Sequence, residues 1–336
     1  MRATEGTVSL EVEAAWRLLL LNWTMIAGMG AALALSLMVT DFSIALSGLA
    51  IGIGYVGLYA GFAHANARSP KRRDPQVIFV LAGIAQVVTI TALMTPLTYI
   101  AASINWPLQD ANLLAIDRFF QIDWAAYVRF VDAHPVLAAW LGYGYTMIRW
   151  PIFAIPVILA ATHRYRRIEE FIFAFGAALI ATAIISALVP AIGVYQQIGL
   201  EPSTLHNLDP QAYLQQLRDL PPTRSGALRH LDLTGLAGIV TFPSFHAASA
   251  ALYAWALWPV KWARPIVVLA NGAMLAATPI IGGHYFIDLF AGIAVAVIAI
   301  VAARKVGRAA MGYSTRTITV PPTAAIAPAA AVAPAE

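Results

Sequence analysis

The sequence predicts an all-α integral membrane protein with about eight transmembrane helices. Of its 336 residues, 60% are hydrophobic and only 11% are charged, and the mean hydropathy is +0.72. Soluble domains carry roughly twice that charged share. Long apolar runs recur along the chain, each close to the roughly 20 residues that a helix needs to cross a bilayer. This composition excludes a soluble enzyme, and a cysteine count of 0 excludes disulfides and thiolate zinc sites.

The apolar runs are rich in Ala, Leu, Ile, Val and Gly, as membrane helices are. They fall at about residues 15–39, 43–64, 76–103, 135–161, 169–192, 240–260, 265–283 and 285–303. The first run follows an acidic stretch, Glu5–Glu13, and it is too long for the core of a signal peptide. We therefore expect it to be retained as the first span.

Basic residues between the runs set the predicted orientation, because cytoplasmic loops of membrane proteins are enriched in Lys and Arg. The clusters are Arg68/Lys71/Arg72/Arg73, Arg164/Arg166/Arg167, Lys261/Arg264 and Arg304/Lys305/Arg308, and they fall on alternate connections. Both termini are then cytoplasmic, and connections 104–134 and 193–239 are external. The net charge of +4 is thus explained by topology and gives no reason to expect a nucleic-acid partner.

Three regions follow from this pattern. Residues 1–134 hold the N-terminal helices and an external segment, residues 135–303 hold a catalytic membrane domain, and residues 304–336 form a basic end with a Pro- and Ala-rich tail that we expect to be disordered. Residues 105–134 mix aromatic and acidic side chains, which suits a helix lying in the membrane interface. This segment is either a lid over a lipid entrance or an aromatic belt that anchors helix ends.

Two of the seven histidines lie where an apolar helix meets the external side: His246 and His284. His284 and Asp288 are four residues apart, so they share one face if a helix begins near His284, and the carboxylate then accepts a hydrogen bond from the imidazole. A carboxylate inside a span is costly unless it is paired. The alternative is that each histidine is only an amphipathic interfacial residue.

The residues before each histidine suit an anionic substrate. Pro243-Ser244 is a helix start signal, and an exposed helix N-terminus attracts anions. Gly282 and Gly283 leave the backbone before His284 open to a substrate. Splitting a phosphoester needs a nucleophile, a group that orients it, donors for the phosphoryl oxygens and an acid for the leaving alkoxide. His284, Asp288, the Ser244 helix start and His246 fit these four roles.

Two motifs resemble a known family. Phe242–Ser249 (FPSFHAAS) and Gly283–Gly292 (GHYFIDLFAG) are similar to the second and third signature motifs of the type 2 phosphatidic acid phosphatase superfamily. They are closest to the branch of inositol phosphorylceramide synthases, which are inositolphosphotransferases of sphingolipid metabolism, and their bacterial relatives. The resemblance covers about residues 135–303 and implies that this part forms a phosphatidic acid phosphatase-like helical bundle.

The resemblance also implies a mechanism. The histidine matching His284 attacks phosphorus and forms a phosphohistidine, the aspartate matching Asp288 orients it, and the histidine matching His246 protonates the leaving group. No metal and no other cofactor takes part in that chemistry.

The chain departs from the phosphatase branch in its cations. That branch has a Lys six residues before an Arg-Pro pair and an Arg six residues before the third-motif histidine, where this chain has Thr278. Arg224 and Arg229 in the external loop before Ser244 are therefore our candidates for binding the phosphate, although each also suits a solvated loop. For Arg149, deep in the fourth apolar run, we favour a structural charge over a part of the headgroup site.

The sequence thus predicts a metal-independent membrane phosphotransferase or phosphatase that acts on a lipid phosphoester and transfers the phospho-headgroup to an acceptor lipid. The alternatives are a plain lipid phosphate phosphatase, a metal-dependent hydrolase using His246, His284 and Asp288, and a transporter whose His and Asp relay protons. The expected location is a bacterial inner or plasma membrane, with the active site on the external face.

Overall fold

The computed structural model describes residues 2–69 and 74–318. Its longer helices are α1 (Arg2–Val39), α2 (Leu46–Arg68), α3 (Pro75–Ala102), α8 (Tyr165–Leu188), α10 (Gln211–Ser225), α11 (Phe245–Leu257), α12 (Arg264–Ile281) and α13 (Phe286–Ile318). The shorter ones are α4 (Asp110–Phe119), α5 (Trp124–Asp132), α6 (Pro135–Tyr145), η1 (Thr146–Ile148), α7 (Trp150–Ala161), α9 (Val194–Ile198), η2 (Pro202–Thr204) and η3 (Lys261–Ala263). The strands β1 (Ser43–Ile44) and β2 (His230–Leu231) pair in parallel. The tail after Thr319 and the basic residues Lys71–Arg73 lie outside the described residues.

The all-α membrane class is confirmed. Within the described ranges, six helices are long and apolar enough to cross a membrane, and a seventh is added if the bent pair Pro135–Ile148 and Trp150–Ala161 is counted as one span. The remaining apolar run contains α11, which has 13 residues. At ~1.5 Å per residue α11 is about 20 Å long, shorter than the ~30 Å hydrocarbon core of a bilayer.

The fourth apolar run is bent next to Pro151, and the bend lies beside Arg149. The two halves, α6–η1 and α7, meet at an angle of 60°. Pro151 occupies the first turn of α7, where its missing N–H costs nothing because first-turn donors have no partner inside a helix. The break leaves Arg149 between η1 and α7.

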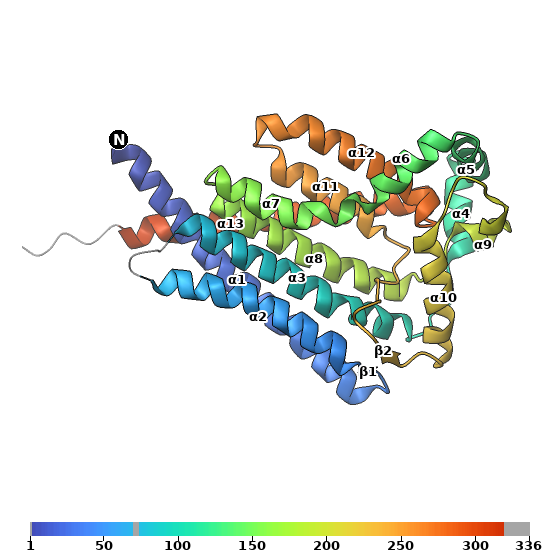
Figure 1. Cartoon of the computed structure of the whole chain (residues 1–336), viewed down its shortest axis with the longest axis horizontal. Coiled ribbons are helices and arrows are strands. Elements are labelled where there is room, and N and C mark those ends of the chain that lie inside the picture. Colours follow the sequence, from blue (N-terminus) through green and yellow to red (C-terminus); the bar gives the residue numbers. More distant parts are fainter. Residues whose placement is uncertain (1, 70–73, 319–336) are drawn as a thin grey trace, which may run out of the picture.

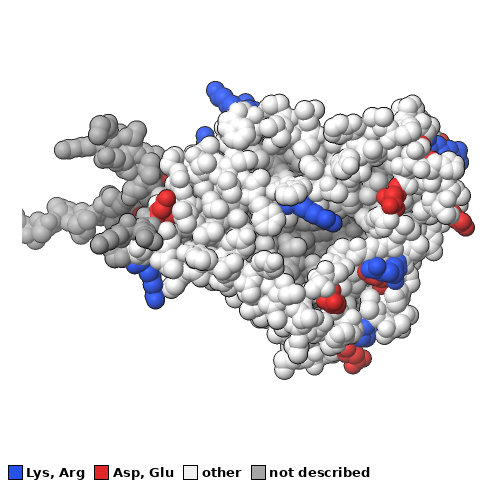
Figure 2. Space-filling model, in the orientation of Figure 1, with Lys and Arg blue, Asp and Glu red and all other residues white. Residues whose placement is uncertain are grey.

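The long helices form one elongated bundle, with α8 in contact with α1, α3, α11 and α13 (Figure 1). Its core is a continuous cluster of buried apolar side chains that includes Phe79, Phe171, Phe175 and Tyr253. The first described residues of α1 and the last turns of α13 lie at the same end of the bundle. Charged side chains on the viewed face lie mostly toward the two ends, and the surface between them is uncharged apart from one basic group near its middle (Figure 2).

The short helices α4, α5, α9 and α10 gather at the opposite end of the bundle and cover it (Figure 1). Tyr99 at the end of α3 donates a hydrogen bond to Asp219 of α10 at 2.9 Å. Asp132 accepts backbone N–H bonds from His206, Asn207 and Leu208. Although burial alone would raise the pKa of Asp132, these three donors together lower it. Polar contacts therefore hold these short helices against the bundle and hold the loop at residues 206–208 against the end of α5.

Candidate active site

His284 and Asp288 form a buried pair where the loop after α12 enters α13. The Nδ1 atom of His284 lies 3.1 Å from Oδ2 of Asp288, and the two residues are 3% and 0% exposed. The same Oδ2 accepts the backbone N–H of Tyr285 at 2.9 Å. Because Asp288 uses Nδ1, the Nε2 atom of His284 stays available, and it has no hydrogen-bond partner in the described part of the chain. The expected hydrogen bond is present, but His284 lies in the loop before α13, which begins at Phe286, so the two residues do not share a helix face.

The two sequence motifs are joined by backbone contacts. The N–H of Ser244 donates to the backbone carbonyl of Asp288 at 3.0 Å. Gly292, one turn further along α13, allows this approach, since a Cβ there would lie 2.1 Å from the carbonyl oxygen of Ser244. The predicted helix start at Ser244 is also confirmed, because its side chain caps α11 by accepting the N–H of Ala247 at 3.4 Å.

His246 lies in the first turn of α11 with its ring stacked on Tyr145, the ring centroids being 4.1 Å apart. Its Nε2 atom is buried and has no hydrogen-bond partner among the residues described. A buried imidazole nitrogen without a hydrogen-bond partner is unusual in a folded protein. A ligand atom at this place would supply the missing hydrogen bond. His246 therefore has one ring nitrogen ready to exchange a proton with a substrate.

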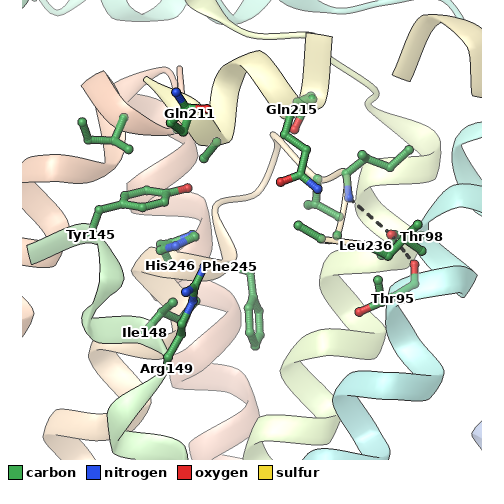
Figure 3. A pocket seen from close by; sticks show the side chains of 18 of the residues that line it. Thr95, Thr98, Tyr145, Ile148, Arg149, Gln211, Gln215, Leu236, Phe245 and His246 are labelled. Atoms are coloured by element: carbon green, nitrogen blue, oxygen red, sulfur yellow. Dashed lines mark hydrogen bonds between the residues drawn. The ribbon is translucent and has the colours of Figure 1, made fainter. Parts of the chain in front are cut away.

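Both histidines line a cavity of about 820 Å³. One wall comes from the α6–η1–α7 bend, the start of α11 and the loop at 282–284, and the opposite wall comes from α3 and α8. Helix α10 and the segment 236–240 supply the remaining side. Figure 3 shows Tyr145, His246 and Arg149 together on one side, facing Thr95 and Thr98 across the cavity. The volume lies within the ~300–1,000 Å³ typical of ligand sites.

Arg149 is the cation that the structure brings to the histidines. It lines the cavity, and its guanidinium lies next to His246 (Figure 3). It has no ion-pair partner within residues 2–69 and 74–318. Arg218 also lines the cavity but is paired with Asp219 at 2.6 Å. The preference for a structural, paired Arg149 therefore disagrees with the structure.

The predicted cations of the external loop lie elsewhere. Arg224 donates to the backbone carbonyl of Trp106 at 2.7 Å. Arg229 donates to the carbonyl of Thr223 at 2.7 Å and stacks over the ring of Phe42 at 4.5 Å. Neither arginine is among the residues that line the cavity. Both loop arginines therefore bind other parts of the chain. The sequence alone does not show which partner an arginine binds.

Gly283 also has a different environment from the one predicted. Its φ is +67°, a conformation that favours glycine, and a Cβ would lie 2.6 Å from the ring of Tyr213. Its backbone carbonyl accepts the N–H of Val194 at 2.9 Å. Gly282 lines the cavity, whereas Gly283 and Ser244 do not. Gly283 and Ser244 therefore do not face the cavity, and they hold the surrounding backbone in place through their own backbone hydrogen bonds.

The segment 105–134 holds the candidate catalytic loop, residues 282–285 with His284, a role that its sequence did not indicate. Asp117 accepts the N–H groups of Phe286 and Ile287 at 2.8 and 3.0 Å, so it caps α13 from another helix. Trp124 donates to the carbonyl of His284 at 3.2 Å. Burial raises the pKa of Asp117, and the two N–H donors partly offset this shift.

Asp110 adds a second link between this segment and the loop. It accepts the hydroxyl of Tyr285 at 2.9 Å and the N–H groups of Ile192 and Gly193. Asp110 and Asp117 are seven residues apart, a spacing that places both on one face of α4, and both are at most 5% exposed. That spacing was the available sequence signal, but it does not say which part of the chain the face contacts.

Among the described residues, no group of three or more His, Cys, Asp or Glu side chains could hold a metal ion. His246, His284 and Asp209 line the cavity, and Asp288 lies behind it, where its carboxylate faces His284. The donors present thus form a hydrogen-bonded pair and a separate imidazole.

The fold and the site define a class: a multi-pass helical membrane protein with a buried His–Asp pair and a second histidine on one cavity. The family model described as the PAP2 superfamily matches residues 111–302, more than half of the chain. The chain belongs to this superfamily and is a membrane enzyme of the phosphatase or phosphotransferase kind, acting on lipid phosphoesters. No curated protein and no solved structure matches it.

Proposed function

We propose that this enzyme transfers a phosphorus-bearing group from a donor lipid to an acceptor lipid through a phosphohistidine on His284. The observation that carries the proposal is the His284–Asp288 pair, whose hydrogen bond at 3.1 Å leaves Nε2 unoccupied beside the cavity that His246 also lines. A histidine held in this way is an oriented nucleophile with a carboxylate to stabilise its developing charge.

In the first half-reaction, the lone pair of His284 Nε2 forms a bond to phosphorus, and the bond from phosphorus to the leaving alkoxide breaks. His246 gives that alkoxide its proton, so the leaving group departs as a neutral alcohol. Arg149 faces the phosphoryl oxygens and offsets the negative charge that builds on them. Asp288 holds the ring of His284 throughout.

In the second half-reaction, a hydroxyl oxygen of the acceptor forms a bond to phosphorus while its proton passes to His246. The phosphorus–nitrogen bond breaks, and the electron pair returns to Nε2 of His284. Transfer to a lipid is favoured over hydrolysis because the Lys and Arg of the phosphatase pattern are absent, an argument from analogy. Water in place of the acceptor would give a plain phosphatase.

The orientation belongs to the same proposal. The basic clusters between the apolar runs support a cytoplasmic position for the end of the bundle where α1 begins and α13 ends. The cavity lies toward the opposite end, beside α10, so donor and acceptor lipids would enter from the external leaflet. We propose a bacterial inner or plasma membrane as the location.

The decisive experiment uses the purified full-length protein and a panel of ³²P-labelled phosphatidic acid, phosphatidylglycerol phosphate and phosphatidylinositol, with and without a neutral acceptor lipid. We expect the label to move to the acceptor, activity to survive EDTA, and vanadate to inhibit, because vanadate mimics pentacoordinate phosphorus. Release of the label only to water would identify a hydrolase. Loss of activity with EDTA, rescued by zinc or manganese, would support the metal-dependent alternative.

A further inference from the structure

The cavity wall opposite the histidines carries a row of hydroxyl groups. Thr91, Thr95 and Thr98 of α3 all line the cavity. Their spacing of four and three residues places them on one helix face. Helix α3 precedes the matched residues 111–302, so these three threonines lie outside the part of the chain that the family model covers. The row is therefore a feature of this chain that the shared chemistry does not explain.

The hydrogen bonds of these threonines determine what they offer a ligand. Thr91 donates to the carbonyl of Val87 at 2.9 Å, and Thr95 donates to the carbonyl of Thr91 at 2.8 Å. Thr98 donates to the carbonyl of Thr95 at 2.7 Å and also accepts the N–H of Ile239 at 3.4 Å. A hydroxyl has one proton and two lone pairs. Thr91 and Thr95 thus keep only acceptor capacity, and a ligand that binds them must supply the donor.

Thr182 adds a hydroxyl of a different kind to the cavity, from helix α8, which packs against α3. It lines the cavity, is 1% exposed, and has no hydrogen-bond partner within the described ranges. Helical threonines commonly bond to the carbonyl four residues earlier, as Thr91 and Thr95 do. A buried hydroxyl without this bond is costly unless a ligand satisfies it.

The wall carries no charge. The residues that α3 and α8 contribute are the four threonines together with Met94, Phe175, Leu179 and Ala183. Apolar side chains beside hydroxyl oxygens suit the neutral headgroup of a lipid and the first carbons of its chains, and they do not suit a second phosphate. The chemistry of this wall therefore differs from that of the opposite wall, where Arg149 and the histidines lie.

We propose that Thr91, Thr95 and Thr182 form a subsite for the acceptor lipid, and that this subsite selects an uncharged amphiphile with hydrogen-bond donors beyond the hydroxyl that reacts. The inference rests on the proposed phosphotransfer. One hydroxyl of the acceptor attacks phosphorus, its proton goes to His246, and the bond from phosphorus to His284 breaks. A further hydroxyl or amide N–H of the same molecule binds the threonines and holds the reacting oxygen in place.

The test uses p-nitrophenyl phosphate as donor in mixed micelles and compares two acceptors. 1-Monooleoylglycerol has two hydroxyls, so one remains for the threonines after the other reacts. Oleyl alcohol has a single hydroxyl and leaves none. The measured quantity is the ratio of phosphorylated acceptor to inorganic phosphate, normalised to nitrophenolate released. This ratio describes how the phosphoenzyme divides between acceptor and water.

The variant is Thr91→Val/Thr95→Val, which keeps side-chain shape, and the matched control is Thr89→Val. Thr89 is on the same helix and bonds the carbonyl of Ala85 at 2.6 Å, but it does not line the cavity. We expect the double variant to lower the ratio for monooleoylglycerol by about tenfold, the loss of one to two hydrogen bonds. The ratio for oleyl alcohol should stay close to that of the unchanged protein, and the control should change neither.

An unchanged ratio for monooleoylglycerol, or an equal fall for both acceptors, would overturn the subsite. The failure of the proposed function looks different. If the unchanged protein releases nitrophenolate but transfers phosphate to neither acceptor, the transferase reaction is wrong, and the acceptor subsite is wrong with it.

Discussion

At the scale of single residues, His284 and His246 differ in what each ring nitrogen already contacts. His284 is paired with Asp288 at 3.1 Å, an arrangement that fixes the ring and leaves one nitrogen for attack. His246 stacks on Tyr145 and keeps a nitrogen without a partner in the described part of the structure. The proposed nucleophile is thus oriented by a carboxylate, and the proposed acid is oriented by an aromatic ring.

The two histidines should respond differently to the leaving group. General acid catalysis is typically worth ~10²–10⁴-fold, and a good leaving group does not need it. We expect His246→Ala to lose about that factor in kcat/KM on a lipid alkoxide ester and to recover much of it on a nitrophenyl phosphoester. His284→Ala should be inactive on both substrates, and Asp288→Asn should fall between the two.

The comparison requires kcat/KM for each variant on both substrates, converted to differences in activation free energy. Equal losses for His246→Ala on the two substrates would remove its role as the acid. A labelled phosphoenzyme that persists in His284→Ala would remove the nucleophile assignment.

A second residue-scale prediction concerns the cation. Arg149 lies beside His246 without an ion-pair partner among the described residues, whereas Arg224 is bonded to Trp106. Hydrogen bonds to charged groups contribute about 1.5–3 kcal/mol, so Arg149→Gln should lower kcat/KM by roughly 10- to 100-fold. Arg224→Gln should have the smaller effect. The reverse order, measured on the same lipid donor, would restore the loop arginine as the phosphate-binding residue.

At the scale of elements, α4 and α5 hold the loop that carries the proposed nucleophile in place. Asp117 caps α13, Asp110 binds Tyr285, and Trp124 binds the carbonyl of His284. Their aromatic neighbours Phe119 and Phe120 are exposed at 80% and 63%. One face of this segment thus holds the catalytic loop while the other carries exposed aromatic side chains.

These contacts predict that residues of α4 affect turnover although they do not line the cavity. Asp117→Asn should lower kcat about tenfold or more with little change in KM, because small misplacements of a reacting group cost large factors in rate. Asp123→Asn is the matched control, since Asp123 caps α5 through Ala126 and does not contact the catalytic loop.

The kinetic measurement is accompanied by thermal unfolding of both variants. Asparagine caps a helix about as well as aspartate, so the two variants should melt similarly. They should differ in kcat, because Asp117 accepts N–H groups through both carboxylate oxygens and an asparagine amide can accept through only one. If Asp123→Asn slows turnover as much as Asp117→Asn does, the effect is general loosening of the segment and the positioning role is wrong.

At the scale of the whole molecule, the two described ends of the chain lie at one end of the bundle and the short helices cover the other (Figure 1). The bundle alone does not determine which end faces the cytoplasm. The positive-inside bias of the basic clusters supports our proposal that the covered end is external.

Reporter fusions test this orientation. We expect fusions after Arg73, Arg167 and Arg308 to report the cytoplasm and an insertion near Asp219 to report the external side. The readout is the activity of an enzyme that works in only one of the two compartments. An external signal at Arg167 would invert the protein and place the cavity toward the inner leaflet.

Local spacing determined a definite part of this protein. The apolar runs set the membrane class, Pro243-Ser244 set the start of α11, and the short separation of His284 and Asp288 keeps their side chains close together where the loop enters α13. Each of these features depends on residues that are near one another in the sequence. Such features can be predicted without knowing which helices pack against one another.

Only the tertiary structure decided which distant residues complete the site. Asp117 meets the start of α13 across 169 residues, Arg149 reaches His246 through a bend of 60°, and the α3 threonines face the histidines across the cavity. For the same reason, the sequence could not show that the loop arginines and Gly283 do not line the cavity. Contacts between helices depend on the summed packing of many side chains, and the spacing within any one segment does not contain that information.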